Sequence, residues 1–283
     1  MSLTRKIDFA VVFTVRNANP NGDPLSGNRP RINYEGLGEV SDVCLKRKLR
    51  NRLQDMEEDI FVQSDNNRVD EHRSLKDRFD KNSKIKAEKD LEKKARIACD
   101  TWYDVRAFGQ VFAFGGDDSV SIGVRGPVSI HSAFSVEEVE ILSLQITKSV
   151  NLKTGSDPNQ KASDTMGMKH RVVHGVYVTK GSINCQLAGK TGFSDKDAEK
   201  LHQALKTMLD NDASSARPEG SMEVASVIWW KHKNPTGQYS SAQVHGSIKV
   251  EDMGQKSSPK IKIVRLKDLE LEFYGLEPEI IEN

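Results

Sequence analysis

Residues 7–24 read IDFAVVFTVRNANPNGDP, a strand that leads directly into a rigid polar loop. In the first half every second residue is apolar: Ile7, Phe9, Val11, Phe13 and Val15. That period of two predicts a strand with one face in a core. In the second half two prolines fix φ, and an Asn-Gly pair tolerates positive φ. We expect this loop to hold amide side chains and backbone N–H groups where phosphate or sugar could bind; the alternative is an ordinary tight turn.

The overall composition describes a charge-rich globular protein with no excess of either sign. The 283 residues include 42 Lys and Arg against 41 Asp and Glu, so any affinity for nucleic acid must come from local patches. Cys44, Cys99 and Cys185 are far apart and odd in number, which indicates reduced thiols and argues against a disulfide framework or a zinc site. No apolar run approaches membrane-spanning length. We therefore expect a cytoplasmic protein without a membrane partner.

A basic helix is predicted after the opening loop. Ser41 is suited to cap its N-terminus, and Leu45, Leu49 and Leu53 recur at helical spacing. The positions between them are strongly basic: Lys46, Arg47, Lys48, Arg50 and Arg52. Such a face is either simply solvated or contacts nucleic acid, and the sequence leaves both alternatives open.

Two polar segments interrupt the predicted core. Residues 55–100 mix acids and bases with few aromatic residues, which predicts a charged helical insertion with a small core of its own, or a partly mobile segment. Residues 145–171 form two strand-like arms around a polar tip and carry five bases against two acids. They predict a protruding hairpin. Loops between core elements can lengthen in this way at modest entropic cost.

The remaining elements define a core order. After the first strand and the basic helix come strands over 122–130 and 172–178, a strand through Ile183, Cys185 and Leu187, a helix capped by Ser194, a strand over 224–230, and strand candidates at 261–266 and 270–274. Without the insertions, the order is strand, helix, strand, strand, helix, strand. We therefore predict an α+β protein, with residues 1–283 forming one domain around the βαββαβ palm of a ferredoxin-like or RRM-like fold.

No group of catalytic or metal-binding residues stands out. His170 and His174 could share a metal on a helix, but on the predicted strand they are about 13 Å apart. The tetrad GGDD at 115–118 is similar to a polymerase turn with metal-binding aspartates, yet most such tetrads are only turns. Asp23 could promote attack by an RNA 2′-hydroxyl, although a lone carboxylate in a turn is usually a turn-former. We expect no cofactor and no metal.

The binding signals favour single-stranded RNA. They are the Asn-rich loop, the basic helix, the basic hairpin, and the loop around Arg217 with its small Ala and Ser residues. Few aromatic residues lie in the middle of the predicted strands, so base stacking of the RNP kind is not evident. The sequence therefore predicts a protein that follows the phosphate–sugar backbone and ignores base sequence.

Six motifs extend this prediction to a family. They read NPNGDP at 19–24, SDVCLKRK at 41–48, DVRAFGQVF at 104–112, GPVSI at 126–130, QITKSVN at 145–151 and MGMKH at 166–170. In this order they resemble the backbone subunit of type I-C CRISPR Cascade complexes, the Cas-seven or Csd-two family of the RAMP superfamily. Residues 55–96 carry little of the resemblance.

The resemblance implies a non-catalytic subunit with an RRM-like palm, a finger-like insertion and a thumb hairpin. It implies that copies polymerise head-to-tail along one CRISPR guide RNA, each thumb displacing a base. The assembly then supports pairing of the guide with a target DNA strand, beside other Cascade subunits, in antiviral defence. Related type III backbone subunits cut RNA with a loop aspartate. The alternative is therefore a metal-dependent ribonuclease that uses Asp23.

The residue patterns and the resemblance together give a set of expected RNA-binding residues. They are Arg16, Asn19, Asn21, Gly22, Arg31, Lys46, Arg47, Arg50, Lys148, Ser149, Asn151, Met166, Lys169, His170, Arg171 and Arg217. Met166 is the predicted apolar wedge at a displaced base, with an anchor for the hairpin itself as the alternative. No catalytic residue is expected.

Overall fold

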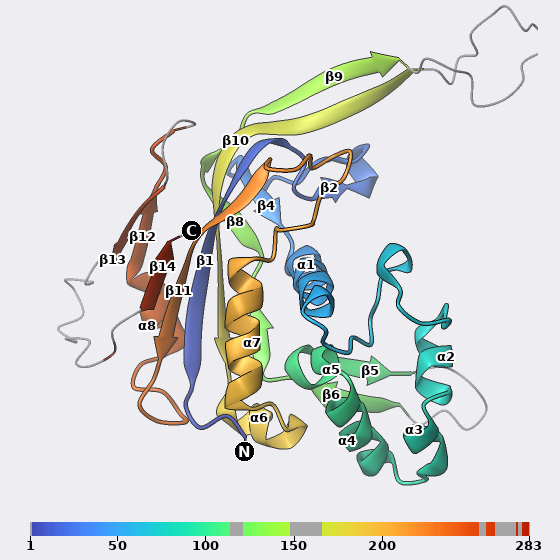
Figure 1. Cartoon of the computed structure of the whole chain (residues 1–283). Helices are drawn as coiled ribbons and strands as arrows, with labels where there is room; N and C mark the ends of the chain where they lie inside the picture. Colours follow the sequence, from blue (N-terminus) through green and yellow to red (C-terminus); the bar gives the residue numbers. More distant parts are fainter. Residues whose placement is uncertain are drawn as a thin grey trace, which may run out of the picture.

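An antiparallel sheet forms the centre of the molecule (Figure 1). The computed structural model describes residues 2–113, 121–147, 166–254, 259–263, 276 and 279–282. Neighbouring strands follow the order β14-β11-β1-β10-β8-β4, and β7 and β9 also pair with β10. The bounds are β1 Ile7–Ala18, β4 Leu37–Val40, β7 Val128–Ile130, β8 Ala133–Glu138, β9 Ile141–Thr147, β10 Met166–Ile183, β11 Met222–Lys231 and β14 Glu279–Glu282. Each pair in this sheet is antiparallel, which confirms a mixed α/β fold around a large antiparallel sheet.

The central strand β1 is buried on both faces. Phe9 and Phe13 belong to the main core, whereas Ala10 and Val12 belong to a second core on the opposite face. The prediction that only one face of this strand would be covered is therefore wrong. The reason is tertiary: β10 and β11 flank β1, and other elements pack over both faces of the sheet.

Two helices cover the main-core face of the sheet (Figure 1). The first, α1 (Asp42–Asp55), begins at Ser41, whose hydroxyl accepts a backbone hydrogen bond from the first turn at 3.3 Å. The second, α7 (Asp195–Lys206), begins at Ser194, which forms a reciprocal capping box with Asp197. Both predicted N-caps are confirmed.

A short helix, α6 (Cys185–Thr191), replaces a predicted strand. Ile183 ends β10, but Leu187 lies inside the helix with Cys185. The side-chain oxygen of Asn184 accepts the N–H of Leu187 at 2.9 Å and so caps the helix. The strand prediction was wrong because the Asn184 cap stabilises a helix, whereas an alternation of only three apolar residues is a weak strand signal.

Elements near the C-terminus cover the opposite face of the sheet (Figure 1). They are α8 (Ser241–Gly246), β12 (Ile248–Glu251) and β13 (Lys260–Ile263). Val244 and Val250 pack there against Ala10 and Val12. The strand predicted over 261–266 begins as β13, while its end and the candidate at 270–274 lie outside the described residues. Helix α8 and strand β12 had no counterpart in the sequence prediction.

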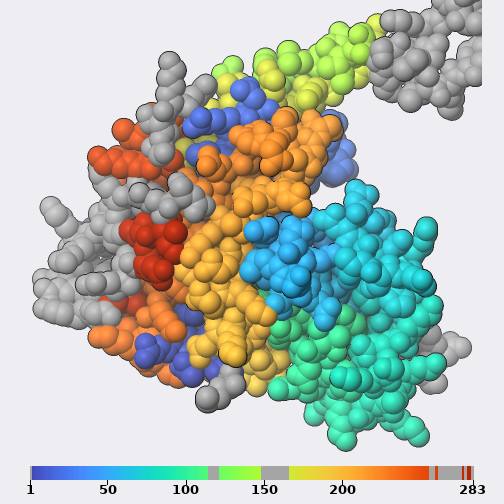
Figure 2. Space-filling model, viewed as in Figure 1, coloured from blue at the N-terminus to red at the C-terminus, as the bar shows by residue number. Residues whose placement is uncertain are grey.

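A helical cluster with its own apolar core lies beside α1 (Figures 1 and 2). It contains η2 (Asp65–Asn67), α2 (Leu75–Asp80), α3 (Ser83–Ala87), α4 (Leu91–Thr101), α5 (Tyr103–Phe108), β5 (Gly109–Phe112) and β6 (Ile122–Arg125). Phe61, Phe79, Trp102 and Phe112 meet in this core at ring-centroid distances of 4.5 to 5.2 Å. The core thus extends past residue 100 into the small β5–β6 sheet.

A hairpin projects from the sheet (Figure 1). Strand β9 pairs with the first part of β10, from Thr147 opposite Met166 to Ile141 opposite Val172. The two predicted arms are confirmed, and β10 continues without a break from the hairpin into the sheet. The predicted tip, residues 148–165, lies outside the described residues. In the described part of the chain, no helix is both long and apolar enough to cross a membrane.

Candidate nucleic-acid interface

A groove of about 280 Å³ lies where the described arms of the hairpin meet two loops. Its lining comes from the Asn-rich loop, both arms of the hairpin and the loop before Arg217: Asn19, Gly27, Asn28, Ile146, Met168, Lys169, His170, Ser215 and Ala216. Figure 2 shows the blue N-terminal segment and the orange loop gathered beneath the yellow-green hairpin. Three segments that are far apart in the sequence therefore form one surface.

The Asn-rich loop is held together by its own amides. The Asn19 amide nitrogen donates to the carbonyl of Asn28 at 2.7 Å, while its oxygen is buried without a hydrogen-bond partner among the described residues. The Asn21 side-chain oxygen accepts two hydrogen bonds from Ser41, both 2.9 Å, and so ties the loop to the start of α1. A Cβ on Gly22 would lie 2.1 Å from the side chain of Asn28. Packing within the loop therefore requires a glycine here.

Asp23 closes the turn between β2 (Gly22–Asp23) and the short helix η1 (Pro24–Ser26). Its carboxylate accepts the hydroxyl of Ser26 at 2.8 Å and the N–H of Leu25 at 3.2 Å, and Arg31 lies 3.4 Å away. These hydrogen bonds, with a smaller contribution from Arg31, lower the pKa of Asp23 below its ordinary value. The described residues contain no group of three His, Cys, Asp or Glu side chains that could hold a metal. Asp23 thus has the geometry of a turn-former.

Lys48 connects α1 to the loop that precedes Arg217. Its nearly fully buried ammonium forms an ion pair with Asp212, and the same carboxylate accepts Nε of Arg217 at 2.9 Å. Burial holds the pKa of Lys48 below its ordinary value despite this partner. The carbonyl of Ala216 in turn accepts the N–H of Asn19 at 2.9 Å. Lys48 therefore positions one wall of the groove, and at this residue the basic face of α1 is buried.

The other cations of α1 also have partners within the chain. Lys46 pairs at 3.0 Å with an aspartate one turn earlier, and Arg47 donates to the carbonyl of Val62 at 2.7 Å. Arg50 pairs at 2.9 Å with Asp104, which is fully buried. None of these three cations lines the groove. Arg47 and Arg50 connect α1 to the helical cluster. No local sequence pattern reveals these contacts.

The hairpin supplies the cationic side of the groove. The ammonium of Lys169 has no hydrogen-bond or ion-pair partner among the described residues. His170 Nδ1 lies 2.9 Å from a serine hydroxyl on β9, which fixes its ring. Nε of Arg171 is buried and has no partner among the described residues. Met168 lines the groove, whereas Met166 lies two residues further along the hairpin and is 64% exposed.

The groove combines amides, a free ammonium and apolar side chains, a composition suited to a phosphate–sugar backbone with an unstacked base. Asn19, Lys169 and His170 are the predicted residues that line it. Other predicted residues lie in the segments beside it: Arg16, Asn21, Gly22, Arg31, Met166, Arg171 and Arg217. Lys148, Ser149 and Asn151 lie outside the described residues. Ile146 and Met168 were not predicted as site residues because in sequence they are indistinguishable from ordinary strand residues.

Comparisons with known proteins agree in the kind of protein they match. A family model described as CRISPR-associated protein Cas7 matches residues 5–273. A protein from Haloferax volcanii, described as CRISPR-associated protein Cas7, is 26% identical over 280 residues, which cover 94% of this chain and 80% of the relative.

Two solved structures are also similar. A chain titled "CRISPR RNA-guided surveillance complex, pre-nicking" aligns with a TM-score of 0.51 at 15% identity. The alignment covers 83% of this chain and 83% of that one. A chain of the type III-B Cmr-beta complex bound to cognate target RNA aligns with a TM-score of 0.42 at 9% identity, over 79% of this chain and 60% of that one. The first is a likeness of fold, and the second is too distant to support an argument.

Proposed function

We propose, from the premise that this chain belongs to the Cas7 family of CRISPR-associated proteins, that it is a non-catalytic backbone subunit of a type I-C Cascade surveillance complex. In this function, copies of the chain assemble head-to-tail along one guide RNA. The assembly supports pairing of the guide with a target DNA strand, beside other Cascade subunits, in the cytoplasm. The observation that carries the proposal is the groove between the arms of the β9–β10 hairpin and the two loops.

The chemistry of the groove supports binding to the RNA backbone. Among the described residues, neither the ammonium of Lys169 nor the buried amide oxygen of Asn19 has a partner. The ammonium can pair with a phosphate, and the amide oxygen can accept a hydrogen bond from a ribose hydroxyl. Ser215 and Ala216 have small side chains, which lets the RNA backbone approach this wall of the groove closely. Among the described residues that line the groove, none has an acidic side chain. Contacts of this kind position a nucleic acid without reading its sequence.

The order of the strands supports the palm of the proposed subunit. Strands β11, β1, β10 and β8 lie side by side, with α1 between β1 and β8 in the chain and α7 between β10 and β11. This is the fourth-first-third-second order of a βαββαβ unit. We assign these elements to an RRM-like palm within one domain over residues 1–283. Residues 55–100 are then the finger-like insertion, and residues 145–171 are the thumb.

Salt-dependent RNA binding tests the proposal. We expect the affinity of the purified chain for single-stranded RNA to fall log-linearly with salt concentration, because bound phosphates release counterions. Lys169→Met should weaken binding to all sequences alike and reduce the salt slope by about one. Lys46→Met is the matched control, since Lys46 lies outside the groove and should change neither. A slope near zero, or a loss confined to some sequences, would contradict backbone binding.

Incubation with labelled RNA and Mg²⁺ separates the scaffold from the ribonuclease alternative. We expect the RNA to remain intact, because both oxygens of Asp23 accept hydrogen bonds within the turn. Cleavage that requires Mg²⁺ and disappears in Asp23→Asn would overturn the non-catalytic assignment and favour the ribonuclease.

A further inference from the structure

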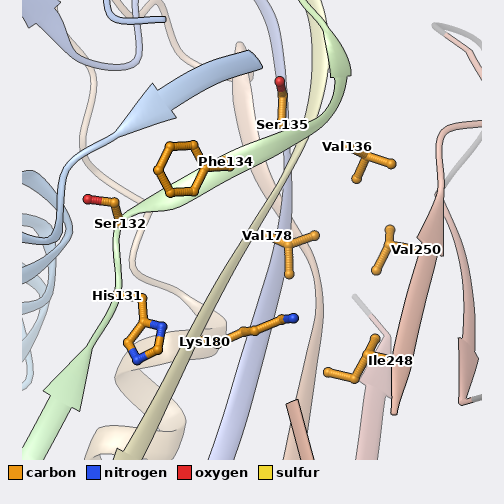
Figure 3. A pocket seen from close by; sticks show the side chains of 9 residues that line it. All are labelled: His131, Ser132, Phe134, Ser135, Val136, Val178, Lys180, Ile248 and Val250. Carbon is orange, nitrogen blue, oxygen red and sulfur yellow. The ribbon is translucent and has the colours of Figure 1, made fainter. Parts of the chain in front are cut away.

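A second cavity, of about 300 Å³, lies on the sheet face opposite α1 and α7 (Figure 3). Its lining comes from β8, β10, β12 and the turn before β8: His131, Ser132, Phe134, Ser135, Val136, Val178, Lys180, Ile248 and Val250. The volume is at the small end of the range for ligand sites. The cavity therefore has room for one ligand group and not for a folded element.

The aromatic ring in this cavity stands on an otherwise aliphatic part of the sheet. Phe134 lies opposite Val178 in the β8–β10 ladder and remains 38% exposed. Figure 3 shows its ring on one side of the cavity, with Ile248 and Val250 on the other. Among the described residues, α8 and β12 cover the middle of this sheet face, and the ring of Phe134 on β8 stays partly exposed beside them. An exposed ring on the open face of such a sheet is a platform on which a base can stack.

The polar groups of the cavity are cationic or neutral. Lys180 is half-buried and has no hydrogen bond or ion pair from its ammonium within the described chain, and burial lowers its pKa below the ordinary value. His131 is held beside it, because its N–H donates to the Lys180 carbonyl at 2.8 Å and its carbonyl accepts the Thr179 hydroxyl at 2.7 Å. None of the described residues that line the cavity is acidic. An anion can therefore pair with Lys180 without repulsion from the cavity walls.

We propose that this cavity is a second nucleic-acid site, which takes one unpaired nucleotide of single-stranded RNA with its base on Phe134 and a phosphate at Lys180. Val178 and Ile248 exclude water from the base, and the ring of His131 and the hydroxyl of Ser132 offer hydrogen-bonding groups at the rim. An acidic peptide segment would satisfy Lys180 but would leave the aromatic face without a matching partner.

The second site is separate from the groove at the hairpin arms. Lys169 of the groove and Lys180 of the cavity are eleven positions apart on β10, which corresponds to about 36 Å of extended strand. The inference rests on the proposed function only in that the chain binds RNA. Variants can therefore address each site by itself.

Photocross-linking of RNA that contains 5-iodouridine, followed by peptide mapping, tests the proposal on the full chain. We expect one cross-link at the groove and a second at Phe134. Phe134→Leu should abolish the second cross-link and weaken binding about tenfold, whereas Phe134→Tyr should restore both. Lys180→Met should weaken binding similarly, and Lys180→Arg should retain it. Lys249→Met is the matched control, because Lys249 lies between Ile248 and Val250 on β12 and points to the other side of that strand.

The outcomes distinguish the two sites. Lys169→Met should weaken the groove cross-link and leave the one at Phe134. A cross-link at the groove alone would overturn the second site and keep the proposed function. If the unaltered chain gave neither cross-link, both the second site and the proposed function would be overturned. Binding of an acidic aliphatic peptide that depends on Lys180, without an RNA cross-link at Phe134, would instead assign the cavity to a protein partner. Thermal melting of each variant checks that it folds.

Discussion

At the scale of single residues, Arg50 neutralises a fully buried carboxylate. Asp104 accepts hydrogen bonds from the N–H groups of Phe61 at 2.7 Å and Val62 at 3.1 Å, and Arg50 completes the set at 2.9 Å. Arg50→Met would leave the Asp104 charge buried with only backbone donors. We expect it to lower the free energy of unfolding by about 3 kcal/mol, measured in urea, and to leave RNA affinity unchanged.

Two further variants make this prediction specific. Arg73→Met is the matched control, because Arg73 is an exposed arginine of the same helical cluster, and it should have almost no effect. Combining Arg50→Met with Asp104→Asn should cost less than the sum of the two single changes, since the buried charge is then absent. If Arg50→Met lowered the RNA affinity and left the stability unchanged, Arg50 would be an RNA-binding residue and this account of its role would be contradicted.

The lowered pKa of Asp23 predicts a pH dependence of the Asn-rich loop. A carboxyl group with a lowered pKa in the folded state stabilises that state above its unfolded value of 3.8, and this contribution is lost as pH falls through the folded value. We therefore expect the amide signals of Leu25 and Ser26 to shift in NMR spectra with a midpoint below 3.8. Asp23→Asn should abolish this transition. A midpoint at or above the unfolded value would show that the turn does not depend on the ionised carboxylate.

At the scale of elements, the hairpin and the sheet have separable roles. The pairs from Thr147–Met166 to Ile141–Val172 are formed by the described arms alone, and β10 is anchored in the sheet by β1. Replacing residues 148–165 with a short Gly-Ser turn should therefore leave the melting temperature nearly unchanged. It should abolish ordered assembly on guide RNA, because a head-to-tail filament needs a projecting element that reaches a different surface on its neighbour.

Light scattering and thermal melting of the shortened chain check this prediction together. A stable shortened chain that still assembles regularly on RNA would show that the segment is dispensable. An unfolded one would show that the segment belongs to the core.

The elements that sequence predicts well are those with local signals. The caps at Ser41 and Ser194 and the apolar alternation of β1 depend on neighbours within a few positions. Helix α6 was missed because a single side chain, that of Asn184, decides between helix and strand there. The second buried face of β1 could not be predicted, since it depends on α8 and β12, which are more than 200 residues away.

At the scale of the whole molecule, the groove shows how much of the candidate site can be predicted from the sequence. The sequence singled out each segment, because polar loops and basic arms stand out in composition. It could not show that these segments meet, nor that the cations of α1 have partners inside the chain. Lys48 is the clearest case. In sequence it resembles a surface residue, but in the structure it is buried in an ion pair with Asp212, 164 positions away. Membership of the Cas7 family, which the motifs over the whole chain predicted, is confirmed.

Charge at this scale favours assembly on RNA over indiscriminate binding. The net charge is only +1, so the molecule as a whole does not attract polyanions, and affinity must come from a few placed cations such as Lys169. A groove of about 280 Å³ has room for few nucleotides, so under the proposed function strong binding requires many copies along one strand. We therefore expect weak binding to short RNA and cooperative binding to RNA that spans several copies, measured by anisotropy at constant salt.

Nuclease footprinting of guide RNA, purified with the chain after co-expression with a CRISPR array, tests the central claim most directly. The account predicts an intact RNA protected along its length, with accessible positions at a regular interval, and loss of that regularity when the groove is altered by Lys169→Met. A single isolated footprint, an irregular pattern, or RNA cut by the chain itself would contradict it.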